Sequence, residues 1–176
     1  WYQITNAARR RIDKTVVPVV ERSTGGAYSA VPASEYRFNY VLGRVEFLAQ
    51  QVVGTVIRVD ANYMPLAKLG GGHEWSADFE RDVLDATEFG DTWRRKVVGL
   101  GSANGSISKW WMDASLLTLL TNGNPLVIVL YADYASNLRY EFYARLAGES
   151  IESAVDSLVD EDLEFESDGE AYYATT

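Results

Sequence analysis

Cysteine is absent from the 176 residues, and histidine occurs once, as His73. The lack of cysteine excludes disulfides, thiolate chemistry and zinc sites that need sulfur ligands. A single histidine also excludes metal sites built from several imidazoles. No apolar run approaches the ~20 residues that a membrane-spanning helix requires. We therefore expect no transmembrane helix and no membrane partner, and we recognise no signal peptide.

Basic residues are scarce, since 16 Lys and Arg stand against 25 Asp and Glu, for a net charge of −9. Domains that read DNA sequence are usually basic, so this activity is not expected. Residues 1–58 hold eight Lys/Arg and four Asp/Glu, a net of +4, so the remainder carries −13. Residues 149–170 hold ten acids and no Lys or Arg. Segments of opposite sign can pair within a chain or between copies, or can be separately solvated faces.

The composition, 47% hydrophobic and 12% aromatic, is that of a globular protein rich in β structure. The glycine-rich stretch 69–74 is the best candidate for a boundary. We predict an N-terminal arm or β-hairpin extension at 1–70 and a main β-sandwich domain at 71–176. The elements expected in the first part are an edge strand at 16–20, where Pro18 cannot donate to a ladder, a loop at 23–34, a hairpin at 36–47 that turns at Leu42–Gly43, and a strand within 52–65.

The second part shows stronger periodicity. In 74–83, Trp75, Ala77 and Phe79 alternate with polar residues, which predicts a half-buried strand. The other expected elements are two strands within 94–111 around a possible tight turn at Asn104–Gly105, a helix at 112–123 capped by Asp113 and ended by Asn122–Gly123, a central strand at 126–131, a strand at 138–147 with Tyr140, Phe142, Ala144 and Leu146 inward, and one or two strands within 149–167 with acids outward.

These elements predict a mainly β fold, an antiparallel β-sandwich or barrel with one packed α-helix, plus an N-terminal β arm or subdomain. The alternation of apolar and polar residues carries this prediction, because a sheet with one wet face needs a period of two.

Candidates for chemistry are few. His73 follows three glycines, and nothing in the sequence marks a nucleophile beside it. The glycine run lacks the Lys-Ser/Thr pair of a phosphate-binding loop. The acidic stretch 160–170 fails as an EF-hand, because Phe165 stands where glycine is required. Asp85, Glu88 and Asp91 could form a glycosidase-like acid pair, but no cleft is indicated. We therefore expect no enzyme, no catalytic residue, no metal and no cofactor.

Tryptophans concentrate in the second part, at Trp75, Trp93, Trp110 and Trp111. Such rings could form a stacking platform for bases or sugars. An adjacent pair in a strand points to opposite faces, so one ring of Trp110–Trp111 faces the core and the other a helix or a second subunit. We favour core plus interface over a ligand platform.

A series of short motifs runs from about residue 74 to residue 170. An Asp-x-Thr-x-Phe-Gly turn precedes a Gly-Ser strand, a helix, an apolar strand, an Arg-Tyr strand, a Ser-Ile-x-x-x-Val-Asp segment and a closing Phe-Glu-x-x-Gly. In this order they resemble the major tail protein (tail tube protein) family of long-tailed bacteriophages. The residues concerned are Asp85, Thr87, Phe89, Gly90, Gly105, Ser106, Arg139, Tyr140, Ser150, Ile151, Val155, Asp156, Phe165, Glu166 and Gly169.

The resemblance implies a structural virion protein located in the phage tail and made in the host cytoplasm. Copies would form rings, expected to be hexameric, that stack into a hollow tube through which DNA passes without specific binding. Other expected partners are the tape measure, terminator and distal tail proteins. An acidic bore would repel the DNA backbone, and 149–170 is a candidate for the lumen or for an interface. The alternatives are a capsid decoration or tail adaptor protein, and a carbohydrate-binding β-sandwich.

The stretch 85–93 is interpreted as a shaped loop that contacts a neighbouring subunit or ring, rather than a mere connection between strands. The predicted subunit-interface residues are Asp85, Thr87, Phe89, Gly90, Asp91, Trp93, Trp110 and Trp111.

Overall fold

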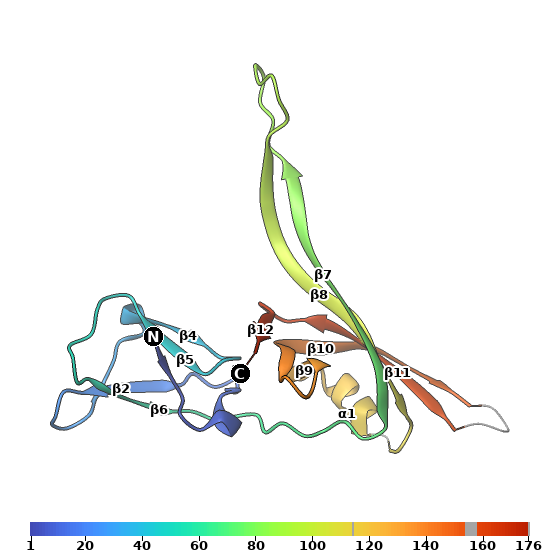
Figure 1. Ribbon diagram of the computed structural model, residues 1–176, viewed down its shortest axis with the longest axis horizontal. Helices are drawn as coiled ribbons and strands as arrows, with labels where there is room; N and C mark the ends of the chain where they lie inside the picture. Colours follow the sequence, from blue (N-terminus) through green and yellow to red (C-terminus); the bar gives the residue numbers. More distant parts are fainter. Residues whose placement is uncertain (114, 154–157, 176) are drawn as a thin grey trace. The chain divides into compact units, whose positions relative to one another are not determined.

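The computed structural model describes residues 1–113, 115–153 and 158–175, and divides the chain into two compact units, Trp1–Ala67 and Lys68–Thr176 (Figure 1). Strands dominate both units, and every sheet is antiparallel. The predicted mainly β fold class is therefore confirmed. Val155 and Asp156, which contribute to the family resemblance, lie outside the described residues.

The first unit contains two three-stranded sheets, with strand orders β1-β5-β4 and β3-β2-β6. Val20, Val31 and Val45 form its buried core, and Tyr36, Phe38 and Phe47 pack against them. The elements are β1 (Tyr2–Gln3), η1 (Ala7–Arg9), β2 (Val19–Ser23), β3 (Ser29–Ala30), η2 (Ala33–Glu35), β4 (Tyr36–Asn39), β5 (Arg44–Phe47) and β6 (Val56–Asp60).

Two predictions for this unit need correction, and two are confirmed, one of them the strand within 52–65, which is present as β6. The hairpin at 36–47 is present as β4 and β5, with Gly43 at a positive φ of 59° in the turn. The edge strand at 16–20 is wrong, because β2 starts after Pro18 and lies in the centre of its sheet, where all its N–H groups are available for pairing. The loop at 23–34 contains β3 and η2.

The second unit is built on one six-stranded sheet. Ala144 of β10 pairs with Leu126 of β9 and with Ser167 of β11, so β9 lies along one edge of β10 and β11 along the other. Beyond β11 come β8 and then β7, while β12 pairs with the start of β10. The elements are β7 (Gly72–Asp85), β8 (Lys96–Trp110), α1 (Ser115–Asn122), β9 (Leu126–Asp133), β10 (Leu138–Glu152), β11 (Asp160–Ser167) and β12 (Tyr172–Ala174).

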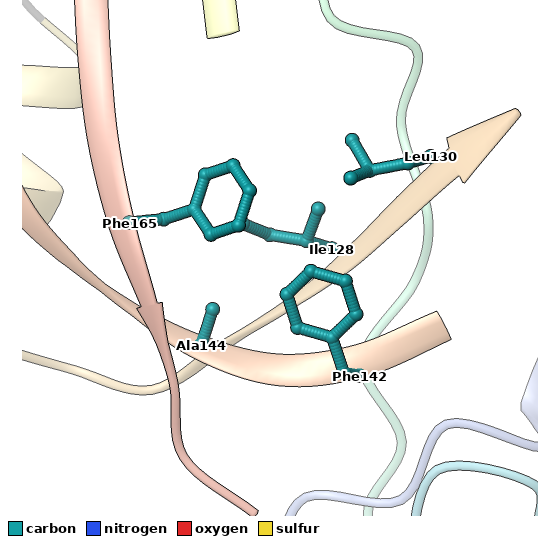
Figure 2. Packing of buried hydrophobic residues seen from close by; sticks show 5 residues of the cluster. All are labelled: Ile128, Leu130, Phe142, Ala144 and Phe165. Carbon is teal, nitrogen blue, oxygen red and sulfur yellow. The ribbon is translucent and has the colours of Figure 1, made fainter. Parts of the chain in front are cut away.

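The core of this unit gathers side chains from three neighbouring strands, as Figure 2 shows: Ile128 and Leu130 of β9, Phe142 and Ala144 of β10, and Phe165 of β11. The rings of Phe142 and Phe165 lie 5.6 Å apart between centroids. Burying each large side chain contributes roughly 1.5–3 kcal/mol relative to leaving it exposed. The prediction that Tyr140, Phe142, Ala144 and Leu146 point inward is confirmed.

The helix α1 is shorter than the predicted 112–123. The backbone N–H of Ser115 donates to Oδ1 of Asp113 over 2.9 Å, and Gly123 at the C-terminal end has a φ of +61°. The side chain of Arg145 on β10 donates to the Gly123 carbonyl, which ties the helix end to the sheet. Leu116 and Leu120 are half-buried, one turn apart, while Leu117 and Leu119 stay exposed.

Two strand predictions in this unit are wrong. β9 was expected in the centre of a sheet, yet within the described ranges it pairs only with β10. Ile128 and Leu130 are buried on one face of β9, and Val127 and Val129 are half-buried on the other, which does not require a neighbour on both edges. The turn expected at Asn104–Gly105 is also wrong, because β8 continues through it and Gly105 pairs with Ala77 and with Phe165.

Gly105 is required by close packing rather than by a turn. A Cβ placed on it would lie 2.6 Å from Cζ of Phe165 and closer still to the backbone oxygen of Ser76. We expect Gly105→Ala to destabilise the second unit by about 1–3 kcal/mol, the usual cost of overpacking. Gly101→Ala on the same strand is the matched control, since its nearest neighbour would be 3.5 Å away. Equal urea midpoints for the two variants would contradict this account of the strand.

Candidate assembly surfaces

The β7–β8 hairpin extends well beyond the rest of the sheet (Figure 1). β11 pairs with β8 only between Asn104 and Trp110, so the distal part is a two-stranded ribbon. Val83 pairs with Val98 and Leu84 with Val97, and consecutive pairs face opposite sides. All four side chains are exposed, as is Leu100. A two-stranded ribbon is marginally stable by itself, and in the described part of the chain no element covers these apolar side chains.

The prediction of a half-buried strand at 74–83 is therefore only partly right. The alternation is present, but Trp75 and Phe79 are 37% and 46% exposed. Periodicity indicates which residues share a face, and it does not indicate whether the same chain covers that face.

The loop at the end of the hairpin is ordered by its own polar groups. Oδ1 of Asp85 accepts from the Thr87 hydroxyl and, over 3.0 Å, from the Thr87 amide. Oγ1 of Thr87 accepts from the Arg95 amide at 3.1 Å, which closes the loop. Oδ2 of Asp91 accepts from the Glu88 amide at 2.9 Å. The hydroxyl of Thr87, then its amide and then Lys96 hold the pKa of Asp85 below its usual value.

This ordered loop presents aromatic side chains outward. Phe89 is fully exposed and Trp93 is 86% exposed, while Gly90 has a φ of +104° that a residue with a side chain rarely adopts. Holding a loop in one conformation before binding lowers the entropic cost of association. Large aromatic residues are also the commonest binding hot spots. The geometry of the loop therefore suits a protein contact better than acid–base catalysis.

Trp110 and Trp111 lie at the other end of the same hairpin. The Trp110 amide donates to the Gly71 carbonyl at 3.1 Å, and the Trp111 amide to the Val159 carbonyl at 2.9 Å. The ring of His73 stacks on Trp110 with centroids 4.4 Å apart. Both tryptophans remain partly exposed. The structure thus groups the six predicted interface residues between Asp85 and Trp93 and separates them from this pair by the strands, about 45 Å at 3.3 Å per residue.

One face of the sheet is acidic, and sequence reasoning had identified only part of it. Residues opposite one another in antiparallel strands share a face. The ladder therefore places Ser76, Asp78 and Glu80 of β7 together with Ser102, Asn104, Ser106 and Ser108 of β8 and with Asp162, Glu164 and Glu166 of β11. All five carboxylates are exposed. Among the described residues of these strands, Arg145 at the margin is the basic residue in register with them, and it is paired with Asp168 at 3.0 Å. We name this surface the acidic face.

No protein-family model matches the sequence, and no curated protein matches it. Solved structures do resemble it, among them two that each have a TM-score of 0.52 and 14% identity over 61% of this chain. One is the tail of an empty gene transfer agent particle with C6 symmetry, of whose chain 85% is covered. The other is the virion of a native gene transfer agent particle, with 88% covered. The likeness is one of fold.

The predicted resemblance to a protein of a phage-like tail is confirmed at the level of the fold. The second unit makes up 109 of the 176 residues, a share close to the 61% that is matched. In the part of the chain that the structure describes, no helix is both long and apolar enough to cross a bilayer.

A buried polar cluster lies on the core face near Trp110, and the sequence prediction missed it. Glu161 was expected to point outward with its acidic neighbours, yet its side chain is fully buried and accepts from Nζ of Lys109, which is itself buried. Glu161 shares its face with Leu163 and Phe165, so the ion pair with Lys109 is what makes the inward position tolerable. Two signals were available in the sequence: the alternation of Glu161 with Leu163 and Phe165, and the basic residue in β8.

Glu149 completes this cluster from β10. Both of its carboxylate oxygens are buried and have no hydrogen-bond donor. Burial, and then the neighbouring Glu161, raise the pKa of Glu149, while Lys109 acts in the opposite direction. The folded state therefore holds this proton more tightly than the unfolded state does.

A raised carboxyl pKa removes stability as the pH rises from the unfolded value, about 4.3, through the folded one. Glu149→Gln cannot ionise, so this variant is expected to melt at a higher temperature than the parent at pH 7. The advantage should disappear below about pH 4, where Glu149 is protonated in both states. Exposed Glu152→Gln controls for the loss of one charge. A melting-temperature difference that does not change with pH would contradict the raised pKa of Glu149.

Proposed function

We propose that the chain is a structural protein of a phage-like virion, and that it self-assembles into stacked rings that form the tube of the tail. The distal β7–β8 hairpin carries this proposal. It is apolar on both faces and lacks a core of its own, in a chain with the fold found in a gene transfer agent tail. The role is mechanical, and no catalytic step is assigned to it.

The open edges of the sheet support ring formation. Among the described residues, β7 pairs only with β8, and β9 only with β10, so the outer edges of both strands are unpaired. Such edges promote aggregation unless another strand or a loop covers them. In a closed ring each copy would offer its β7 edge to the β9 edge of its neighbour, which would pair both of these edges. Sixfold symmetry is proposed because the similar tail has C6 symmetry.

The acidic face would line the bore. The second unit holds twenty acids and eight Lys/Arg, a net of −12, and the carboxylates of the acidic face are exposed with a single basic residue at its margin. Negative charge along the bore would repel DNA phosphates and let the genome slide. Asp162, Glu164 and Glu166 would then place part of the segment 149–170 in the lumen. The first unit, with a net of +3, would be the arm or subdomain added to the tube.

Assembly of the purified chain tests this proposal. Sedimentation should show large polymers, and negative-stain electron microscopy should show stacked rings or hollow tubes. Small uniform particles that bind capsids would favour a decoration or adaptor protein. A glycan affinity that falls when Trp110 or Trp111 is replaced would favour a carbohydrate-binding domain.

A further inference from the structure

We infer that the carboxyl groups of Glu149 and Glu161 bind one proton between them, and that this shared proton acts as a pH-sensitive switch of the stability of the second unit. Lys109, Glu149 and Glu161 make up what we call the buried charge cluster. It lies where β8, β10 and β11 come together at the end of the sheet. The inference concerns a single copy of the chain, so it does not depend on the proposed tube.

A β-bulge in β10 turns Glu149 toward the core. From Tyr140 to Leu146 the even-numbered residues of this strand point inward. The register against β11 shifts after Leu146, and Glu149 then pairs with Leu163, whose side chain is buried. Without the shift, alternation would turn Glu149 outward to the acidic face. Bulges recur where a side chain must be re-aimed, so the inward position of Glu149 is a built feature of the strand.

The buried charge cluster lacks one positive charge. Nζ of Lys109 donates to Oε2 of Glu161, and both side chains are buried, so this pair is balanced. Oε1 of Glu161 and both carboxylate oxygens of Glu149 are also buried, and no donor among the described residues reaches them. A second carboxylate beside a balanced pair leaves a net negative charge in the interior, which is costly. One proton removes this charge, because neutral Glu149 can donate its O–H to Oε1 of Glu161.

Other charged groups near the cluster do not supply the missing positive charge. Asp113, which precedes α1, interacts with Lys109 from an exposed position and is itself an acid. Nε2 of His73 lies 3.8 Å from Oδ1 of Asp160. Asp160 alternates with Glu161 along β11, however, so this pair belongs to the opposite face of the sheet. Among the described residues, the charges that face one another on the inner side are those of the buried charge cluster.

The two carboxyl groups are expected to titrate as a pair. Burial, and then a hydrogen bond with Glu161, raise the pKa of Glu149, whereas Lys109 lowers it. A hydrogen bond between two carboxyl groups needs a proton on one of them. Once that proton leaves, two carboxylates repel each other in the interior. The stabilisation from the proton is therefore fully present below the unfolded pKa, about 4.3, and is lost as the pH rises through the folded value.

Unfolding by urea at several pH values tests the shared proton. The reference is Glu149→Gln, whose amide can donate to Glu161 at any pH. Relative to this variant, the unfolding equilibrium constant of the parent should rise as the pH increases above about 4, by at most about tenfold per pH unit. Glu164→Gln, an exposed change on β11, is the matched control and should follow the parent. A parent that follows Glu149→Gln at every pH would overturn the inference.

The Glu161→Gln background separates a shared proton from the burial of Glu149 alone. In this background Glu149 becomes the counter-ion of Lys109 and no longer needs a proton. The added Glu149→Gln change should then lower the urea midpoint at neutral pH instead of raising it, and an unchanged stabilising effect would overturn the inference. Carbon-13 NMR gives a second readout, because the carboxyl carbons of Glu149 and Glu161 in the parent should titrate over the same pH range. Titration of Glu149 alone would count against sharing.

A bound metal ion is the competing source of positive charge, since calcium favours carboxylate oxygens. The parent, freed of metal with EDTA, should have the same urea midpoint at neutral pH with and without added calcium chloride. A midpoint that rises with calcium in the parent and not in Glu149→Gln would show that the cluster takes a metal ion in place of the shared proton.

Discussion

Replacement of Phe89 and Trp93 by alanine in one chain is expected to abolish tube formation and to leave the fold intact. Both side chains are exposed and support no core, so their removal should change the free energy of unfolding by less than about 0.5 kcal/mol. A hot-spot residue is worth about 2 kcal/mol or more in a contact, so each loss raises the concentration needed for assembly about 30-fold.

Tyr134→Ala is the matched control for this double variant. Tyr134 is also exposed and aromatic, but it lies in the loop between β9 and β10, away from the hairpin. Circular dichroism and thermal melting should be unchanged for both proteins, while sedimentation should separate them. If the double variant polymerises at the same concentration as the parent, the loop from Asp85 to Arg95 is only a connection between two strands, and the interface assigned to it is wrong.

Lys109→Met is expected to have the largest effect on stability, a loss of about 3–5 kcal/mol, because it leaves the buried carboxylate of Glu161 without its counter-ion. The added variant Glu161→Leu should recover most of that loss, since replacing both members of a buried ion pair with apolar side chains is often neutral or stabilising. Urea unfolding of the parent, the two single variants and the double variant measures the coupling.

One outcome of this comparison of four proteins would contradict the proposed ion pair. If the double variant is as unstable as the sum of the two single ones, Lys109 and Glu161 act independently and the inward position of Glu161 needs another explanation. Arg58→Met with Glu21→Leu is the comparison nearer the surface, because in this pair of the first unit Arg58 is exposed and Glu21 half-buried, so it should show less coupling.

The alternation of apolar and polar residues predicted most strands and the faces of their side chains, because this pattern depends only on residues close in sequence. Phe142 and Ala144 could be placed inward, and the hairpin at 36–47 could be located, on this basis. Long-range packing decided the rest. Gly105 reads as a turn residue in isolation, and only the approach of Phe165 from β11 shows why glycine is needed in a continuous strand.

In the candidate surfaces, too, some features depend on local sequence and others on long-range packing. The self-contained hydrogen bonding of the loop from Asp85 to Arg95 follows from residues close in sequence, and it was anticipated as a shaped loop. The sequence did not predict the separation of Trp110 from Phe89, because the turn expected at Asn104–Gly105 would have folded β8 back on itself. Glu161 was misplaced because all acids of 149–167 were expected to point outward, although Glu161 alternates in step with Leu163 and Phe165. The ion pair with Lys109, which lies opposite it, stabilises the inward position.

Cryo-electron microscopy of the assembled chain tests the central claim most directly. The account predicts a hollow tube of stacked rings in which the sheet of the second unit encloses the bore and Asp78, Asp162 and Glu164 face the lumen. A map in which the chain forms closed particles, or in which these carboxylates lie on the outside of the tube, would contradict it.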